Sequence, residues 1–424
     1  MESHSGGRSA SQQQDIRQYL LVTLNYWGFT LTDGALRMLV VLHFHQLGFT
    51  PLAIALLFVL YELFGVITNL VGGWLGARVG LNRTMQVGLL LQIVALLMLT
   101  VPDLWLTMTF VMVAQALSGI AKDLNKMSAK SSIKLLISDQ PQSTLFRWVA
   151  LLTGSKNALK GVGFFAGGLL LQWVGFRSAL LLMAVGLVLM LLLCSRYLRQ
   201  DLGRMTKKVR FREVFSNSRS VNILSAARLF LFGARDVWFV VALPVFLAVN
   251  LGWSHQQVGG FLALWIIGYG IAQTLAPFLT GKRAGYTPDG YSAVSWAALL
   301  ALLPALLAWL LDPAMSTLNN APEDRAWLLI AGLMLFGVVF AVNSSLHSYL
   351  IVSYAREDGV SLDVGFYYMA NALGRLGGTL LSGWLYQAQG LTACLWVSAV
   401  LVLLAALISF GLPRHPRETG SVSS

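Results

Sequence analysis

Two cations stand at matching places inside long apolar stretches of the sequence. Lys160 lies in the stretch 146–172, and Arg375 lies in the stretch 363–387. A positive side chain at the centre of a membrane helix costs about 2.5 to 3.5 kcal/mol unless it faces water or an anion. Because this cost is incurred twice at equivalent places, the sequence predicts a binding site for a negatively charged ligand between the two stretches.

A second lysine accompanies the first. Lys156 precedes Lys160 by four residues, so both lie on one face of a helix, about 15 Å and 21 Å from an entry near Phe146. Lys160 and Arg375 rank first, because Lys156 has no cationic counterpart in the other stretch. A guanidinium can bind a phosphate-like group through two parallel hydrogen bonds, whereas an ammonium acts as a point charge. The pair therefore suits a small, doubly anionic substrate.

Other charged residues fall at similar depth in the predicted helices. Asp33 and Arg37 are four residues apart, and Arg235 and Asp236 are adjacent. They either form ion pairs that keep a polar cavity neutral, or the arginines bind substrate while a carboxylate carries a proton. Glu62 has no cation within one turn on its own helix, so it is the first candidate for proton coupling, with Asp33 and Asp236 after it. Structural pairing of these carboxylates with the basic residues remains the alternative.

Further basic residues extend toward one end of the predicted helices. A stripe of lysines recurs every four residues at Lys122, Lys126, Lys130 and Lys134. The stripe is either solvated or lipid-facing, or it forms an electrostatic funnel that concentrates an anionic substrate. Arg228 either extends the cationic lining of the site or reaches out to the lipid headgroups.

The composition is that of a membrane protein. Of 424 residues, 56% are hydrophobic and 11% are charged, and the mean hydropathy is +0.68. Stretches long enough to span a bilayer occur at 18–44, 51–76, 84–101, 104–124, 146–172, 177–197, 221–248, 255–280, 290–311, 326–354, 363–387 and 391–412. The sequence has two isolated cysteines, no phosphate loop and no cluster of metal ligands. Neither a cofactor nor an enzymatic activity is therefore predicted.

The chain is internally duplicated. The positions Lys160, Gly163, Gln172 and Gly175 recur 215 residues later as Arg375, Gly378, Gln387 and Gly390. The predicted fold is all-α, with twelve transmembrane helices in two pseudo-symmetric six-helix bundles whose shared site lies near the bilayer midplane. The predicted segments are a disordered leader (1–17), a first bundle (18–198), a basic linker (199–220), a second bundle (221–412) and a tail (413–424).

The basic residues are distributed unevenly. Most of the 30 Lys and Arg residues fall in the leader, the linker, the tail and the loops on their side of the membrane. This asymmetry places both termini in the cytoplasm and makes the chain a multi-pass protein of the inner (plasma) membrane. Anionic lipid heads account for the net charge of +12, and nucleic acid is not expected as a partner.

Part of the sequence resembles a known superfamily. Residues 73–80 read Gly-Trp-Leu-Gly-Ala-Arg-Val-Gly and continue to Arg83. This segment resembles the loop between helices 2 and 3 of the major facilitator superfamily. Ala77 stands where that motif has an aspartate, so the salt bridges that the aspartate makes in the family are not expected here.

A closer resemblance runs through most of the membrane domain. Residues 26–37, 121–130 and 153–160 are long polar segments, and they resemble the ArsJ-type organoarsenical efflux permeases. That resemblance implies export of 1-arseno-3-phosphoglycerate, which a partner glyceraldehyde-3-phosphate dehydrogenase makes from arsenate, with arsenate resistance as the result. Proton exchange is the expected driving force. The alternatives are a carrier of sugar phosphates or other organic anions, and a non-transporting membrane sensor.

Overall fold

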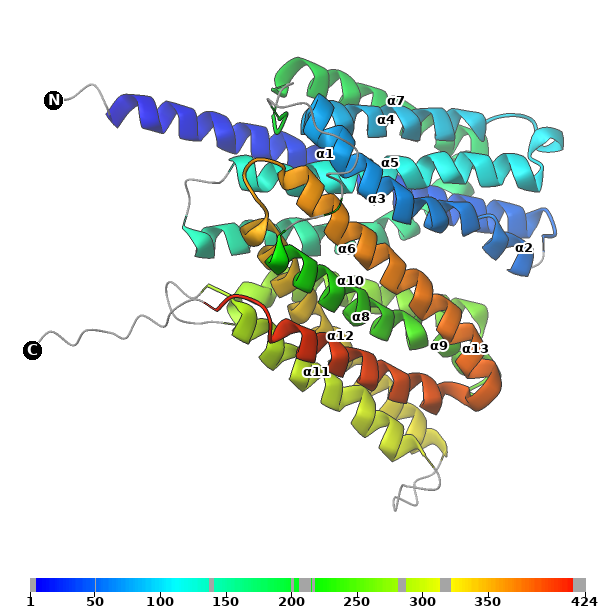
Figure 1. Cartoon of the computed structure of the whole chain (residues 1–424). Coiled ribbons are helices and arrows are strands. Elements are labelled where there is room, and N and C mark those ends of the chain that lie inside the picture. The colour runs from blue at the N-terminus through cyan, green and yellow to red at the C-terminus, as the bar shows by residue number, and fades with distance from the viewer. Residues whose placement is uncertain are drawn as a thin grey trace, which may run out of the picture.

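The computed structural model describes residues 5–49, 51–136, 141–199, 202–205, 215, 218–280, 287–312 and 322–414. Within these ranges the chain forms helices and no strands (Figure 1). The helices are α1 (Ser5–Gln46), α2 (Pro51–Leu56), α3 (Val59–Val79), α4 (Leu81–Met98), η1 (Asp103–Trp105), α5 (Met108–Leu136), α6 (Gln142–Val174), α7 (Phe176–Tyr197), α8 (Arg219–Phe239), α9 (Ala242–Val249), α10 (His255–Thr280), α11 (Gly290–Leu311), α12 (Pro322–Tyr354) and α13 (Val360–Ser409).

These helices supply the twelve predicted membrane crossings. The pairs α2 with α3 and α8 with α9 each form one interrupted crossing, and α13 supplies two because its backbone turns at Gly390 (φ 78°). Eight helices in the described ranges are long and apolar enough to cross a membrane by composition alone. The long helices outside that set are α1, α5 and α6. Their lower hydropathy reflects the polar and charged residues that this bundle carries in its interior.

The backbone confirms the internal duplication. Gly175 and Gly390, which match at the 215-residue offset, have φ values of 79° and 78°. Gly48 and Gly252, which follow α1 and α9, have φ values of 86° and 67°. Each of these residues adopts a left-handed conformation that glycine reaches without strain, so both halves turn between helices in the same way.

The repeated glycines bring equivalent helices into close contact. A Cβ atom on Gly163 of α6 would lie 2.5 Å from the carbonyl oxygen of Leu31 in α1. A Cβ atom on Gly378, its counterpart in α13, would lie 2.5 Å from the carbonyl oxygen of Gly233 in α8. The backbones of α1 and α6, and of α8 and α13, therefore pack directly against each other, as small residues allow in membrane helices. This packing sets the depth and direction of Lys160 and Arg375 one turn away.

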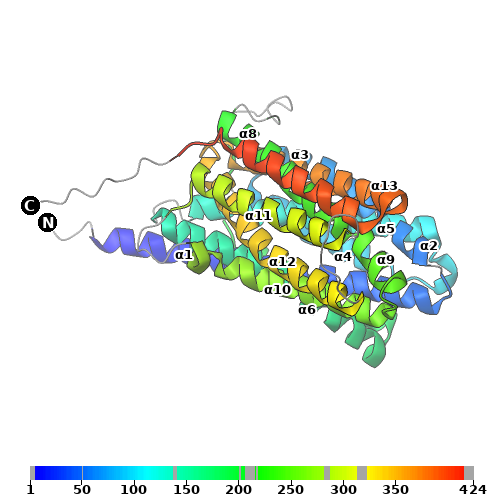
Figure 2. The same ribbon diagram turned by 90° about the horizontal axis from the view of Figure 1, so that it is seen from below.

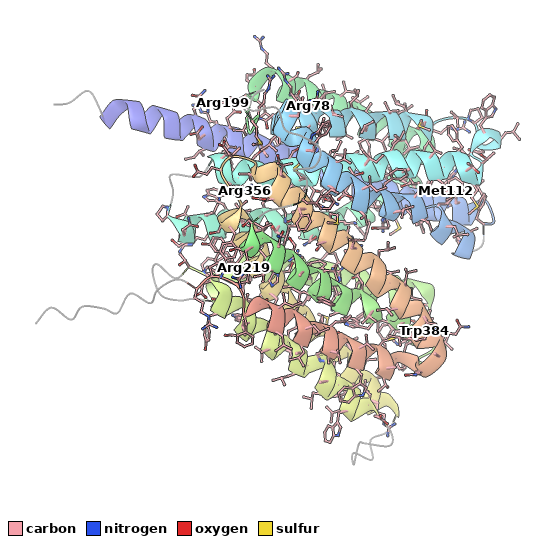
Figure 3. All side chains as sticks on the ribbon, in the orientation of Figure 1. Arg78, Met112, Arg199, Arg219, Arg356 and Trp384 are labelled. Atoms are coloured by element: carbon pink, nitrogen blue, oxygen red, sulfur yellow. The ribbon has the colours of Figure 1, made fainter. Side chains whose placement is uncertain are left out.

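The start of α1 and the end of the described chain lie at one end of the molecule (Figures 1 and 2). We call this end the terminal side and the opposite end the far side. In Figure 3, Arg78, Arg199, Arg219 and Arg356 lie toward the terminal side, whereas Met112 and Trp384 lie toward the far side. These labelled arginines therefore lie at the end where α1 begins and the described chain ends.

The hydrophobic cores show that the two halves join at the terminal side. One core cluster combines Tyr19 and Phe146 of the first half with Tyr349 and Tyr367 of the second. Toward the far side there are two separate clusters, one built from α1 to α7 and the other from α8 to α13. The described residues therefore form a structure that is closed at the terminal side and divided toward the far side.

Specific contacts reinforce that closure. Lys134 at the end of α5 donates hydrogen bonds to the carbonyl oxygens of Ser353 and Ala355 at the end of α12. Nearby, a Cβ atom on Gly73 of α3 would lie 3.2 Å from the Cα atom of Gly365 in α13. Main-chain carbonyls are thus the hydrogen-bond acceptors of a lysine that crosses from one half to the other.

One segment differs from its prediction. Helix α1 begins at Ser5, inside the segment 1–17 that was predicted to be a disordered leader. The polar residues there continue the helix that the following apolar residues anchor, so composition alone misjudged the start of α1. Most of the predicted linker 199–220 lies outside the described residues.

Candidate functional site

The site begins with two neighbouring helices of the first half. On α1, Asp33 accepts a hydrogen bond of 2.7 Å from the hydroxyl of Tyr61 on α3. One turn along α1, Arg37 pairs with Glu62 on α3 at 3.0 Å and lies 4.7 Å from the centre of the Tyr61 ring. Arg37 therefore pairs between helices and not with Asp33, although the spacing of four residues allowed either partner.

The pairing continues into the second half. Glu62 also lies 3.7 Å from Arg375 on α13, and Arg375 donates to Asp236 on α8 at 3.1 Å. Asp236 completes the series with Arg235, at 2.5 Å. We call the series Arg37, Glu62, Arg375, Asp236 and Arg235 the ion-pair chain. It joins the two halves through a single carboxylate, Glu62.

Arg375, one of the two residues ranked first for substrate binding, is therefore charge-compensated in this conformation. The structural alternative, pairing with Glu62 and Asp236, describes its contacts here. Its side chain is still 37% exposed and that of Glu62 is 39% exposed, whereas Asp236 is fully buried. Since Arg375 and Glu62 belong to opposite halves and lie 3.7 Å apart, that exposure lies at the boundary between the halves. An anion reaching this boundary would meet Arg375 only by competing with its carboxylates.

Lys156 and Lys160 have no such compensation. In the described part of the chain, no carboxylate oxygen lies within 4.0 Å of either ammonium nitrogen. Lys160 Nζ lies 5.9 Å from the centre of the Phe164 ring on its own helix. The charged groups within electrostatic reach of Lys160 are the cations Arg37, Lys156 and Lys122 and the carboxylates of Asp33 and Glu62, so cations are more numerous. These two lysines keep an excess of positive charge beside the ion-pair chain.

The lysine stripe on α5 also contributes to this region. Lys126 pairs with Asp123 at 2.5 Å, and Lys122 lies 3.8 Å from Asp123 and 3.8 Å from the centre of the Tyr61 ring. Lys130 is buried. The solvated or lipid-facing interpretation of this lysine stripe is therefore wrong, because the stripe faces the interior. Asp123, an acid within the stripe, was the sequence signal for this orientation.

Arg228 is also inside the protein. It is buried on α8 and donates to Asn371 at 2.9 Å and to the Ser344 carbonyl oxygen at 3.2 Å. It does not reach out to the lipid headgroups. Even without Arg228, the cations in the central region outnumber the carboxylates. The cations are Arg37, Lys122, Lys126, Lys156, Lys160, Arg235 and Arg375, and the acids are Asp33, Glu62, Asp123 and Asp236.

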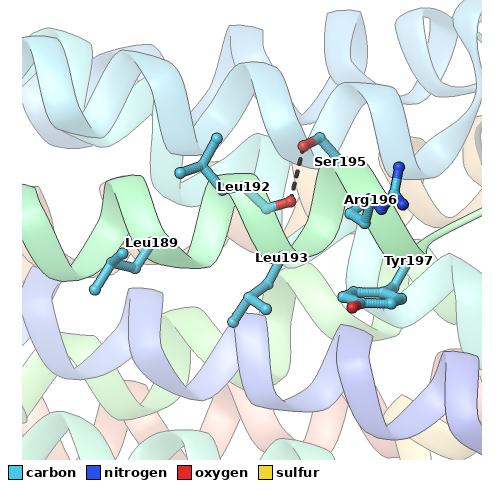
Figure 4. Close-up of a pocket in the computed structure, with 6 residues that line it drawn as sticks. All are labelled: Leu189, Leu192, Leu193, Ser195, Arg196 and Tyr197. Atoms are coloured by element: carbon cyan, nitrogen blue, oxygen red, sulfur yellow. Dashed lines mark hydrogen bonds between the residues drawn. The ribbon is translucent and has the colours of Figure 1, made fainter.

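Two grooves lie apart from this region. One, of about 670 Å³, runs along the outer face of α7, where the Ser195 hydroxyl donates to the Leu192 carbonyl oxygen (Figure 4); it is lined by Leu189, Leu192, Leu193, Ser195, Arg196 and Tyr197. The other, of about 700 Å³, lies at the terminal side and includes Arg199, Arg204 and Glu357. Neither includes a residue of the ion-pair chain, so the candidate site is defined by its charges.

The architecture and the sequence identify the family. The sequence profile of the Major Facilitator Superfamily matches residues 19–318 and also residues 224–423. The chain belongs to the major facilitator superfamily. Its second match begins within the first turns of α8, where the second half starts. As a major facilitator protein, the chain is a transporter of the secondary carrier type, with several helices crossing a membrane.

Solved structures of major facilitator proteins share the fold. The proton:xylose symporter XylE, bound to 6-bromo-6-deoxy-D-glucose, has a TM-score of 0.71 at 14% identity, covering 95% of this chain and 96% of that one. The human organic anion transporter MFSD10 (TETRAN) has 0.71 at 16%, covering 93% and 99%. A bacterial homologue of the iron transporter ferroportin, in an outward-facing state, has 0.71 at 15%, covering 92% and 98%. No curated protein matches in sequence.

Proposed function

We propose that this major facilitator protein exports a small organic anion with two anionic ends, 1-arseno-3-phosphoglycerate, from the cytoplasm. The observation that carries the proposal is the pair of uncompensated lysines, Lys156 and Lys160, beside an ion-pair chain that spans both halves. A cation left without a counter-ion at mid-membrane is unfavourable unless an anion visits it. The arsenic chemistry comes from the resemblance to the ArsJ-type permeases, and the charge of the substrate comes from the site.

The geometry suits a ligand with two anionic ends. One end binds between Lys156 and Lys160, where attraction to each ammonium at 4 Å is worth up to about 4 kcal/mol at an effective dielectric constant of ~20. The other end approaches Arg375, whose guanidinium can bind a phosphate-like group through two hydrogen bonds once it releases a carboxylate. Arg37 and Arg235 flank Arg375 through the carboxylates that they share with it.

Proton exchange is the proposed driving force, with Glu62 as the first coupling residue. Glu62 holds Arg37 and Arg375 at the same time, so protonating it would loosen both pairs in one step. It is also partly exposed, which allows it to exchange a proton with water. Asp33 and Asp236 remain secondary candidates, because Asp33 accepts from Tyr61 and Asp236 is fully buried.

Export also requires an orientation in the membrane. We place the terminal side in the cytoplasm of a cell with an inner (plasma) membrane, because the loops and termini on that side carry the excess of Lys and Arg. In that orientation the described structure is closed to the cytoplasm and divided toward the exterior. The protein acts as a carrier without catalysis of its own, and its substrate is supplied by a glyceraldehyde-3-phosphate dehydrogenase that accepts arsenate.

A second candidate is a carrier of sugar phosphates or other organic anions, because lysine and arginine select for charge and not for arsenic. Arsenate resistance separates the two candidates. The experiment is to express the chain in an arsenate-sensitive cell, with and without an arsenate-tolerant glyceraldehyde-3-phosphate dehydrogenase. We expect resistance only when both proteins are present.

Two variants connect that result to the site. Lys160→Met should abolish resistance at unchanged membrane levels, whereas Arg83→Met, which changes an exposed cation outside the site, should leave resistance intact. Resistance without the dehydrogenase, or full resistance in Lys160→Met, would contradict the proposal.

A further inference from the structure

A second group of cations lies between the candidate site and the terminal side. Lys130 is eight residues from Lys122 along α5, and Arg228 is seven residues from Arg235 along α8. At 1.5 Å per residue these spacings place both cations about 10 to 12 Å nearer the terminal side. Lys130 is 4% exposed and Arg228 is 3% exposed. They belong to different halves of the protein and face the boundary at which those halves close.

No carboxylate in the described ranges forms an ion pair with either cation. The charged groups that act on Lys130 are Arg228, Lys156 and Lys126, all of them positive. Its ammonium lies 5.0 Å from the centre of the Tyr368 ring. Arg228 lies 3.8 Å from the centre of the Phe232 ring and 5.3 Å from that of Tyr367. Both buried cations therefore contact aromatic rings and have no anionic partner in the described structure.

Polar atoms around these cations also lack hydrogen-bond partners within the described structure. They are the hydroxyls of Tyr367, Tyr368 and Ser348 and the Nδ1 atom of His347, and all four side chains are buried. Ser348 lies close to both phenols, but none of the three oxygens makes a well-formed hydrogen bond within the described structure. Buried hydroxyls are nearly always satisfied in native proteins, so a cluster of unsatisfied ones indicates a missing partner.

We propose that Lys130, Arg228 and the surrounding hydroxyls form a second anion-binding site, distinct from the one at Lys156 and Lys160. Its ligand is a small oxyanion group, such as a phosphate or a carboxylate. An oxyanion has several acceptor lone pairs, so it can bind the ammonium, the guanidinium and the hydroxyls at once. A lipid headgroup is excluded by the burial of both cations.

The site has a consequence for closure of the terminal side. Lys130 is on α5 of the first half, whereas Arg228 and Tyr367 are on α8 and α13 of the second. Two like charges brought together in a low-dielectric boundary repel each other, and a bound anion turns this repulsion into attraction for both halves. An anion that enters from the terminal side would thus promote closure behind itself. Only the direction of travel in this step rests on the proposed function.

The test measures binding of inorganic phosphate to the purified full-length protein in detergent, by equilibrium dialysis with radiolabelled phosphate. Lys130→Gln should bind one phosphate fewer per chain than the wild type. It should also melt at a higher temperature in phosphate-free buffer, because one of two unbalanced cations is gone. Tyr368→Phe keeps the aromatic ring but removes one donor, and should weaken this phosphate about tenfold. Arg83→Gln, with an exposed cation outside both sites, serves as the control.

The outcomes separate this site from the proposed function. If Lys130→Gln binds as much phosphate as the wild type and melts no higher, the second site does not exist. In a competition experiment at constant ionic strength, chloride is added at the same concentration as phosphate. If chloride displaces the labelled phosphate, the site is not one for oxyanions. Loss of one phosphate in Lys130→Gln, together with retention of this phosphate in Lys160→Gln, supports the second site whether or not the chain confers arsenate resistance.

Discussion

Replacement of Glu62 by glutamine tests whether this carboxylate competes with the substrate. Glu62 lies 3.0 Å from Arg37 and 3.7 Å from Arg375, and it is the one carboxylate in the ion-pair chain that contacts both halves. A substrate anion must displace it before reaching either arginine. In Glu62→Gln, Arg37 loses its carboxylate partner and Arg375 keeps only Asp236, so the substrate anion should bind more tightly.

The magnitude follows from the distances and the exposure. At an effective dielectric constant of ~20, each pair would attract by about 4 to 6 kcal/mol. The side chains of Arg37, Glu62 and Arg375 are 27%, 39% and 37% exposed, so solvent screening reduces each pair to less than about 1 kcal/mol. Two pairs at about 0.7 kcal/mol each come to about 1.4 kcal/mol, which is a tenfold gain in affinity.

The assay is calorimetric titration of the purified protein with 3-phosphoglycerate, a stable analogue of the proposed substrate. Glu357→Gln, which neutralises an exposed carboxylate outside the ion-pair chain, is the matched control and should bind like the wild type. Transport into inverted vesicles should meanwhile lose its dependence on the proton gradient in Glu62→Gln. Equal or weaker binding in Glu62→Gln would refute the competition, and an unchanged response to the gradient would assign proton coupling to another residue.

Three further predictions concern the packing of α6 against α1, the closure at the terminal side and the guanidinium group of Arg375. Gly163→Ala should destabilise the contact of α6 with α1 by about 1 to 3 kcal/mol, because its Cβ would lie 2.5 Å from a carbonyl oxygen; an unchanged melting temperature would contradict this. Lys134→Gln weakens the bonds to Ser353 and Ala355, so thiol reagents should label a cysteine placed at the terminal-side boundary about tenfold faster. Arg375→Lys keeps the positive charge but loses the planar guanidinium that can make two parallel hydrogen bonds, so it should impair transport far more than it lowers the amount of protein in the membrane. A transport rate equal to that of the wild type would show that the mechanism does not need these two hydrogen bonds.

The sequence determined the architecture almost completely. Runs of apolar residues have the length that a bilayer demands, so the crossings could be counted without coordinates. The repeat from Lys160 to Gly175 and from Arg375 to Gly390 predicted two equivalent halves, because backbone turns and close helix contacts require glycine at defined places. Composition was less informative at the start of α1, since polar residues extend a helix that is anchored elsewhere.

The partners of the charged residues were decided only by the tertiary structure. Periodicity gives the depth of a residue and the residues that share its helix face, but not which other helix that face meets. Glu62 and Arg375 meet because α3 and α13, far apart in the chain, cross at the boundary between the halves. For the same reason the lysine stripe on α5 could not be assigned to lipid or interior from its spacing. Burial of Lys130 opposite Arg228 required both halves to be in place.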